Sequence, residues 1–254
     1  MRTHYSHLIA GAVLAVCFSG LRIAPAQDRA LASAPAFGGG VFVTPVAGAP
    51  FSAVAVQEMR QTLRDGSSFQ RKTQALIARD SAGRVRNERH QVLAANSTRE
   101  PALLSVHLYD PDTRLSTLLN PFTRVARQQT LTRAPDTAPP GNWAQHPKTS
   151  FGNNVRLEDL GPAALDGVEV HGYRRTTTLG GESTGTGKPM AVIDEYWYSE
   201  ELRINLLSKH IDPRSGDLTI TVTNLNRTEP DPNLFEIPQG YKVVDLTPEP
   251  AEAQ

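Results

Sequence analysis

Apolar and polar residues alternate most clearly near the C-terminal end of the chain. Residues 202–206 have the sequence Leu-Arg-Ile-Asn-Leu, and residues 218–223 have the sequence Leu-Thr-Ile-Thr-Val-Thr. An alternation of apolar and polar residues with a period of two, which gives one apolar face, is typical of a half-buried antiparallel strand. The segment between them, 212–217, is Asp-Pro-Arg-Ser-Gly-Asp and has the composition of a loop. The pattern therefore predicts a β-hairpin over 202–223.

Upstream of this hairpin, turn signals divide the chain into short segments. The signals are Asp65-Gly66, Ala82-Gly83, Asp110-Pro111 and Asp166-Gly167. Asp-Gly is favoured in tight hairpins because both central residues need positive φ. The segments between the signals are predicted strands: 53–64, 67–79, 84–94, 103–109, 155–160 and 168–178. We therefore expect a mainly β protein with few or no long helices apart from a signal peptide.

The early segments leave alternatives open. Val56, Met59 and Leu63 have helical spacing, although the turn signal that follows favours a strand. In 67–79 and 84–94, charged and amide side chains are spread over both faces. Either these strands extend beyond the core, or the sheet curves and its concave side is partly solvated.

The N-terminus has the pattern of a secretory signal. A start containing Arg2 precedes the apolar run Leu8–Leu21, and Ala24-Pro25-Ala26 is an A-x-A cleavage site. The run is shorter than the about 20 residues that span a bilayer, although an uncleaved anchor is an alternative, and Cys17 follows Val16, a poor residue for lipidation. We expect cleavage after Ala26 and a mature protein in the periplasm or outside the cell.

The remaining chain is expected to form one domain. Residues 27–50 are rich in Ala, Pro and Gly and are predicted to be a flexible leader, followed by a domain over 51–246 and a disordered tail over 247–254. Cleavage also removes the one cysteine, so an ordinary core must hold the mature protein without a disulfide.

Charge and hydropathy narrow the possible partners. Loss of Arg2 and Arg22 with the signal leaves 24 basic and 26 acidic residues, a net charge of −2. This balance argues against non-specific nucleic-acid binding. No second apolar segment approaches membrane-spanning length, so we expect membrane contact only through the signal peptide. The oligomeric state is not predicted.

Two long loops interrupt the strands. Residues 128–154 contain Ala134-Pro135-Asp136 and Pro139-Pro140-Gly141, and a stretch of this length inside a domain is often a lid or binding loop. Trp143 favours a loop that docks, although a floppy insertion is the alternative. Residues 180–189 form a second loop rich in Gly, Ser and Thr.

Catalytic motifs are matched only in part. Gly181-x-Ser183-x-Gly185 fits a nucleophile elbow, but the glycines and Pro189 that follow do not begin a helix well. Glu182 and Pro189 break a phosphate-loop pattern around Gly187-Lys188. The histidines lack metal-site spacing. We therefore expect a non-catalytic protein with no cofactor or metal, and a hydrolase using Ser183 is the less favoured alternative.

An acidic and aromatic segment covers Asp194 to Tyr198. If 190–198 is a strand, Glu195 and Trp197 share one face, whereas Asp194, Tyr196 and Tyr198 share the other. The aromatic residues are predicted to pack on the sheet, and Trp197 is also a candidate ligand contact.

The last third of the chain resembles a known family. Residues 194–199 lead into the hairpin, and the chain then continues Glu229-Pro230-Asp231-Pro232 and Leu234-Phe235-Glu236-Ile237-Pro238-Gln239-Gly240-Tyr241. This C-terminal segment resembles the end of the sequences in the outer-membrane lipoprotein carrier (LolA-like) superfamily and in exported acidobacterial-type proteins. Counterparts of 50–53, 62–66, 79–84, 109–111 and 119–121 extend the resemblance over residues 50–244.

The resemblance implies a strongly curved antiparallel sheet, an incomplete barrel whose apolar concave side holds acyl chains under a lid. Here the 128–154 loop with Trp143 would be that lid. We expect an exported carrier or sensor of a lipid, a lipidated protein or another apolar molecule, and an envelope protein-interaction factor is the alternative. The candidate cavity-lining residues are Trp197, Leu202, Ile204, Leu206, Leu218, Ile220 and Val222.

Overall fold

The computed structural model of the chain describes residues 41, 43–63, 65–133 and 154–247, all within the unit Pro35–Gln254. These residues are mostly strand. The elements are β1 (Phe51–Thr62), β2 (Ser68–Arg79), β3 (Val85–His90), β4 (Leu93–Ala94), β5 (Leu103–Asp110), β6 (Leu115–Asn120), β7 (Val125–Thr130), β8 (Val155–Leu165), β9 (Val168–Leu179), α1 (Gly181–Thr184), β10 (Met190–Ser199), β11 (Ile204–Asp212), β12 (Gly216–Asn226), the 3-10 turn η2 (Pro232–Phe235) and β13 (Lys242–Asp245).

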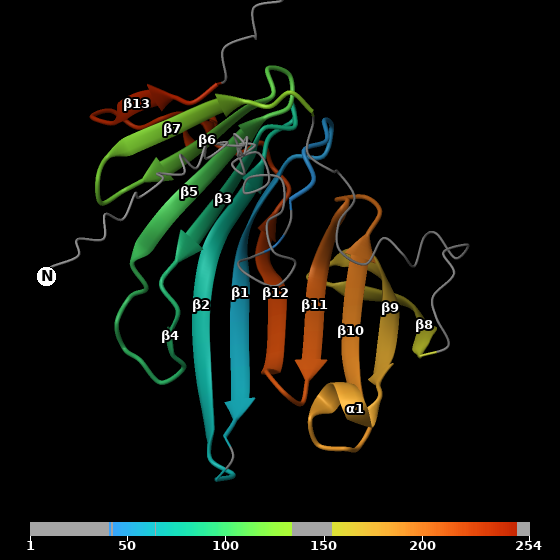
Figure 1. Cartoon of the computed structure of the whole chain (residues 1–254). Coiled ribbons are helices and arrows are strands. Elements are labelled where there is room, and N and C mark those ends of the chain that lie inside the picture. The colour runs from blue at the N-terminus through green and yellow to red at the C-terminus, as the bar shows by residue number, and fades with distance from the viewer. Residues whose placement is uncertain (1–40, 42, 64, 134–153, 248–254) are drawn as a thin grey trace, which may run out of the picture. The chain divides into compact units, whose positions relative to one another are not determined.

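The strands form one open sheet. Its order is β13-β7-β6-β5-β3-β2-β1-β12-β11-β10-β9-β8, and β4 pairs with β2 beside this path. Neighbouring strands are antiparallel, except that β13 runs parallel to β7. Figure 1 shows the sheet bending strongly without closing into a barrel. The expected mainly β fold with an open, curved sheet is confirmed, and neither described helix is long and apolar enough to span a membrane.

The turn signals predict the hairpins well. Gly66 and Gly83 have φ of 82° and 89° at the turns β1–β2 and β2–β3. At the β8–β9 turn, both Asp166 and Gly167 have positive φ, 49° and 76°. The alternative of a helix over 53–63 is wrong, because β1 occupies this segment and pairs with β2 along its whole length.

Two strands lie where no strand was expected. β6 and β7 follow matching turns, Asp110-Pro111-Asp112-Thr113-Arg114 and Asn120-Pro121-Phe122-Thr123-Arg124. In each, the first side chain accepts hydrogen bonds from the main chain two and three residues on, and the arginine has positive φ. The predicted loop over 128–154 therefore starts too early, because residues 128–130 belong to β7.

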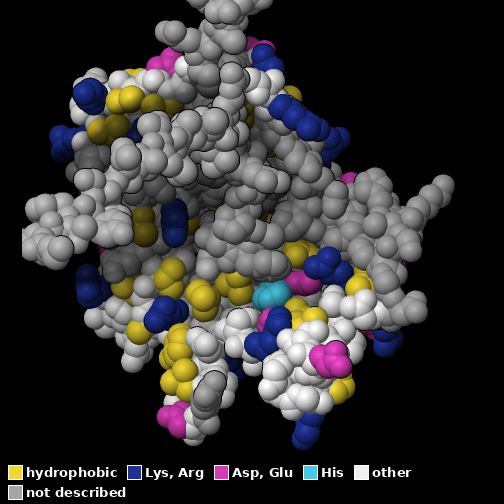
Figure 2. All heavy atoms as spheres, viewed as in Figure 1, with side chains coloured by type: hydrophobic (Ala, Val, Ile, Leu, Met, Phe, Trp, Pro, Cys, Tyr) yellow, Lys and Arg dark blue, Asp and Glu magenta, His cyan; other side chains and the backbone are white. Residues whose placement is uncertain are grey.

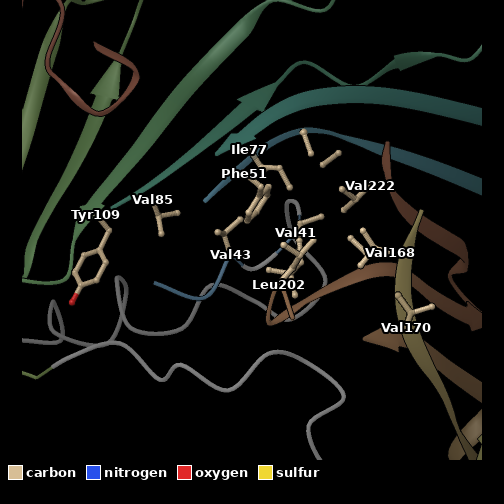
Figure 3. Close-up of a cluster of buried hydrophobic side chains, with 14 residues drawn as sticks. Val41, Val43, Phe51, Ile77, Val85, Tyr109, Val168, Val170, Leu202 and Val222 are labelled. Carbon is tan, nitrogen blue, oxygen red and sulfur yellow. The ribbon is translucent and has the colours of Figure 1, made fainter. Parts of the chain in front are cut away.

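The main core brings together buried side chains from both halves of the sheet (Figure 3). It joins residues from β1, β2, β3 and β5 to residues from β9, β11 and β12. Its buried members are Val41, Val43, Phe51, Ala53, Ala55, Ile77, Val85, Tyr109, Val168, Val170, Leu202, Ile204, Leu206 and Val222.

The segment before β1 is part of this core. Val41 and Val43 expose 7% and 4% of their surface, and Thr44 exposes 3%. The end of the predicted flexible leader over 27–50 is thus corrected, because Val41 and Val43 are buried members of the main core. The first strand begins at Phe51, two residues before the predicted segment 53–64.

A second core covers the opposite face of the sheet. Val106 and Leu108 alternate with Tyr109 of the main core, so they point to the other side of β5. Ile237 and Tyr241 pack against them together with Leu119 and Ala126. The segment that carries the family resemblance therefore builds this core.

Candidate functional site

Four of the candidate cavity-lining residues lie in the main core. Leu202, Ile204, Leu206 and Val222 expose 2%, 0%, 1% and 3% of their surface. Leu202 precedes β11, in the turn after β10. These four side chains pack against other core residues, so a ligand could touch them only if the core opened.

Trp197, like Ile220, is partly buried and packs against the main core, although the strand register points the two side chains to opposite faces of the sheet. β10 pairs Tyr196 with Ser208, and β12 pairs Ser208 with Ile220, so Ile220 shares a face with Tyr196. Trp197 instead covers Gly172, where an added Cβ would come within 2.7 Å of its ring. Its Nε1 donates to Glu195 Oε1 at 2.9 Å, which places Glu195 and Trp197 on one face. Trp143 lies outside the described residues.

An apolar stripe leaves the main core along β1 and β12. Ala55 pairs with Val222 inside the core, and both are buried. Two residues further on, Ile220 is half-buried and packs on the core margin. Two residues further again, half-buried Leu218 pairs with Met59, which exposes 38% of its surface. The core therefore grades into an accessible apolar surface, which we call the apolar stripe: Ile220, Leu218 and Met59. On the face seen in Figure 2, hydrophobic side chains gather over the lower strands with charged side chains beside them.

A polar row continues from this stripe across the sheet. Leu218 pairs with His210, His210 with Asp194, and Asp194 with Arg175, all on the face of the stripe. Asp194 Oδ1 lies 2.7 Å from His210 Nδ1, and Asp194 Oδ2 accepts from Arg175 Nη2 at 2.7 Å and Nε at 3.1 Å. The Asp194 side chain exposes only 4% of its surface. Burial, with help from Asp194, raises the pKa of Tyr196 to about 12, so its hydroxyl remains a neutral donor.

A small cavity lies at the other side of the stripe, where β2 parts from β3. β3 pairs with β2 only from Val85 to Asn87, and β4 takes over further along β2. The cavity has a volume of about 60 Å³ and is lined by Ala55, Gln57, Thr73, Ala75, Asn87, Glu88, Arg89, His90, Val92 and Ile220.

The cavity offers polar groups next to an apolar surface. Thr73 Oγ1 is buried and has no hydrogen-bond partner in the described part of the chain. Glu88 is held by Arg86 at 2.6 Å and His90 at 2.8 Å. Burial opposes the ionisation of Glu88, but these hydrogen bonds outweigh it and lower its pKa. The cavity has room for a few waters or a small polar group.

A row of alternating charges crosses the opposite face. We call Glu158, Arg174, Glu195, Lys209, Thr219, Glu58 and Lys72 the charged row, because each is paired with the next across neighbouring strands. Glu195 is its centre: Oε2 accepts from Arg174 Nη2 at 2.7 Å, and Oε1 accepts from Lys209 Nζ at 3.2 Å. Burial works against the charged form of Glu195, but the bonds from Trp197, Arg174 and Lys209 lower its pKa overall.

The described residues include no group of side chains placed as a metal site. Ser183 lies in the short helix α1, and among the described residues no hydrogen bond joins its side chain to a histidine. No group of three or more His, Cys, Asp or Glu side chains in the described part of the chain is placed to hold a metal ion. The charged contacts of Asp194 and Glu195 are ion pairs with arginine and lysine, together with a hydrogen bond between Asp194 and His210.

Comparisons with known proteins give only distant structural similarities. No family model matches the chain, and no curated protein matches it. A conserved protein of Thermus thermophilus has a TM-score of 0.39 at 13% identity, over 78% of this chain and 90% of that one. The MucA/MucB complex of Pseudomonas aeruginosa gives 0.38 at 13% identity, over 77% of this chain.

This chain spans 58% of the matched chain of that complex, less than two thirds of it. The lipoprotein LppX of Mycobacterium tuberculosis gives a TM-score of 0.29 at 14% identity, over 71% of this chain and 88% of that one. Lipoprotein structures are thus among the matches, but similarity at this level carries no argument about function.

Proposed function

We propose that this chain is a non-catalytic binding protein that carries or senses an amphiphilic molecule, such as a lipid or a lipid-modified protein. The observation that supports this is the apolar stripe, which continues the main core onto accessible surface at Ile220, Leu218 and Met59. Covering such surface with an acyl chain is favourable by roughly 25 cal/mol per Å².

Polar groups on both sides of the stripe suit the head of such a molecule. Thr73 Oγ1 in the cavity would gain a partner, and leaving a buried hydroxyl without one costs about 1–3 kcal/mol. His210 and Arg175 on the other side carry donors around the buried Asp194 carboxylate. The ligand would lie on the apolar stripe. The four candidate residues that lie in the main core would pack beneath the stripe without touching the ligand.

Binding of a fluorescent long-chain fatty acid to the purified protein tests this function. Ile220→Gln should weaken binding about tenfold, which corresponds to ~1.4 kcal/mol. Ile211→Gln is the matched control, because Ile211 is 37% exposed in the adjacent strand but on the opposite face. Met59→Gln, at the exposed end of the stripe, repeats the test without touching the core.

A wild-type protein that neither binds the fatty acid nor retains lipid in native mass spectrometry would contradict the proposal and favour a protein-interaction role. Equal effects of the Ile220 and Ile211 variants would also contradict it.

The proposal includes export. The Leu8–Leu21 run and the Ala24-Pro25-Ala26 site support cleavage after Ala26. N-terminal sequencing of the protein recovered from the periplasm or medium of a Gram-negative host should begin at Gln27. A product that begins at Met1 and stays in the cytoplasm would contradict export.

A further inference from the structure

The β8 end of the sheet has an open edge with a defined polarity. β8 pairs with β9 and with no other strand in the described part of the chain. Asn154 O accepts from Thr178 N at 2.8 Å, so residues 154 and 178 are a hydrogen-bonded pair. Antiparallel pairs alternate. The N–H and C=O groups of Val155 and Leu157 therefore point away from β9, toward the edge.

The side chains along this edge are complementary to themselves. If a second β8 lay antiparallel with a two-fold axis through Leu157, Leu157 would face Leu157 of the second copy. Arg156 would then face Glu158, and Glu158 would face Arg156, on one side of the joined sheet. Leu157 is 36% exposed and the Arg156 side chain is 76% exposed.

This arrangement would extend the charged row. The row ends at the edge on Glu158, whose Oε1 accepts from Arg156 Nη2 of the same chain at 2.9 Å and whose Oε2 lies 3.9 Å from Arg174 Nη1. Within one chain, Glu158, Arg174 and Glu195 alternate between acidic and basic side chains from the edge toward the middle of the sheet. Arg156 of a second copy would add a basic side chain next to Glu158 and so continue this alternation. On the opposite face, the two Leu157 side chains would cover each other.

The rest of the edge limits the pairing to a short stretch. A bulge lies between Asp159 and Gly161, and Gly161 has φ of 79°. Beyond the bulge, Gly161 pairs with Gly172 and Pro162 pairs with His171. The main-chain groups of β8 alternate between β9 and the open edge, so the nitrogen of Pro162 points toward the edge. Because this nitrogen carries no hydrogen, it cannot donate to another strand. Only Val155 to Asp159 can therefore form a regular ladder with another strand.

The other edge of the sheet lacks this complementarity. In β13, Leu246 N and Lys242 N donate to β7, so Val243 and Asp245 point their main-chain groups outward. A two-fold axis through Val243 would place Lys242 opposite Val244, without an acidic partner. The two edges are thus distinguishable by charge.

We propose that two copies of this chain associate through β8, antiparallel about Leu157, to join their sheets across Arg156–Glu158 pairs. The interface is small, so we expect a reversible dimer. This inference is independent of the proposed binding function.

Charge reversal gives a decisive test, using sedimentation of the purified protein over a micromolar to near-millimolar series. Arg156→Glu places a second carboxylate opposite Glu158, and Glu158→Arg places two arginines opposite each other. Each variant alone should dimerise at least about tenfold more weakly than the wild type. An equimolar mixture of the two should recover dimerisation, because every facing pair is then opposite in charge.

Lys242→Glu, at the β13 edge, is the matched control and should dimerise like the wild type. A wild-type protein that stays monomeric throughout the series would overturn the proposal. Single variants that dimerise like the wild type, or a mixture that stays monomeric, would overturn it as well. Circular dichroism of each variant establishes that a loss of dimer is not a loss of fold.

Discussion

Arg79 at the end of β2 donates from Nη2 to the main-chain carbonyl of Leu202, 123 residues further along the chain, at 2.8 Å. The same guanidinium donates to the carbonyls of Thr44 at 2.7 Å and Ala49 at 2.7 and 2.9 Å. It is fully buried and lies over the Phe51 ring. One side chain thus fixes the segment before β1 and the turn before β11 to the centre of the sheet.

Replacing Arg79 should be among the most destabilising single changes. Burial lowers the pKa of Arg79 to about 10, so the group is still charged at neutral pH. Arg79→Met removes four charge-assisted hydrogen bonds and leaves the buried carbonyls of Thr44 and Leu202 and the partly buried carbonyl of Ala49 without this donor, at a cost of about 3–5 kcal/mol. Urea unfolding measures the change. Arg99→Met, at an exposed position, should stay within about 0.5 kcal/mol of the wild type, and an equal loss would refute this role of Arg79.

Gly172 should be sensitive to a single added methyl group. An alanine Cβ there would lie 2.7 Å from Cζ3 of Trp197. Gly172→Ala should therefore displace the indole, shift tryptophan emission and destabilise by about 1–3 kcal/mol. Gly180→Ala is the control, because a Cβ at Gly180 meets nothing within 4 Å. Unchanged emission from the Gly172 variant would show that the ring is not held over this position.

Glu195 should matter more than Glu58, although both belong to the charged row. The side chain of Glu195 exposes 8% of its surface and binds three donors, whereas that of Glu58 exposes 59% and faces Lys72. Glu195→Gln should cost about 2–3 kcal/mol, and Glu58→Gln less than about 0.5 kcal/mol. Thermal unfolding compares them, and similar shifts would count against a central role for Glu195.

Asp212 should contribute to stability only above strongly acidic pH. Hydrogen bonds from Arg214 lower the pKa of Asp212 to about 2. Because the folded-state pKa lies below the unfolded value of about 3.9, the contribution is complete above about pH 4 and is lost as the pH falls toward 2.

The contribution of Asp212 to the free energy of unfolding is about 1 kcal/mol, since solvent around the half-exposed Arg214 screens the pair. Asp212→Asn should flatten the loss of stability between pH 4 and 2. The double variant Asp212→Asn/Arg214→Gln should cost no more than either single change, and full additivity would indicate that the two side chains do not interact.

The sequence predicts the hairpins because their turns depend on local chemistry. Asp166-Gly167 and Asp65-Gly66 mark their turns by residue type alone. β6 and β7 were missed because Arg114 and Arg124 occupy the positive-φ positions, where arginine gives no signal. The repeated Pro-x-Thr-Arg after Asp110 and Asn120 could have shown that the two turns are equivalent.

The candidate site was predicted less well, because it depends on register between strands. Alternation correctly separated Glu195 and Trp197 from Asp194 and Tyr196. It could not show that Ile220 lies on accessible surface while Leu206 is enclosed, since both follow the same local pattern. Burial there is decided by the curvature that brings β9 and β11 over the segment before β1.

The polar rows also had a signal in the sequence. Arg174-Arg175, Asp194-Glu195 and Lys209-His210 are doublets of alternating sign on three strands that turn out to be neighbours. Adjacent strand residues point to opposite faces, so each doublet supplies one polar side chain to each row. Only the pairing of β9, β10 and β11 shows that the doublets align.

The pairing of β1 with β12, which joins Ser52 to Asn226, has a consequence for the order of synthesis. The central strand of the sheet lacks one neighbour until nearly the whole polypeptide has left the ribosome. Contacts between such distant segments make folding slow, because a very long loop must close before they form. A nascent chain of this topology therefore stays unfolded for longer than a locally connected one, which is the condition in which a polypeptide can be threaded through a translocation channel.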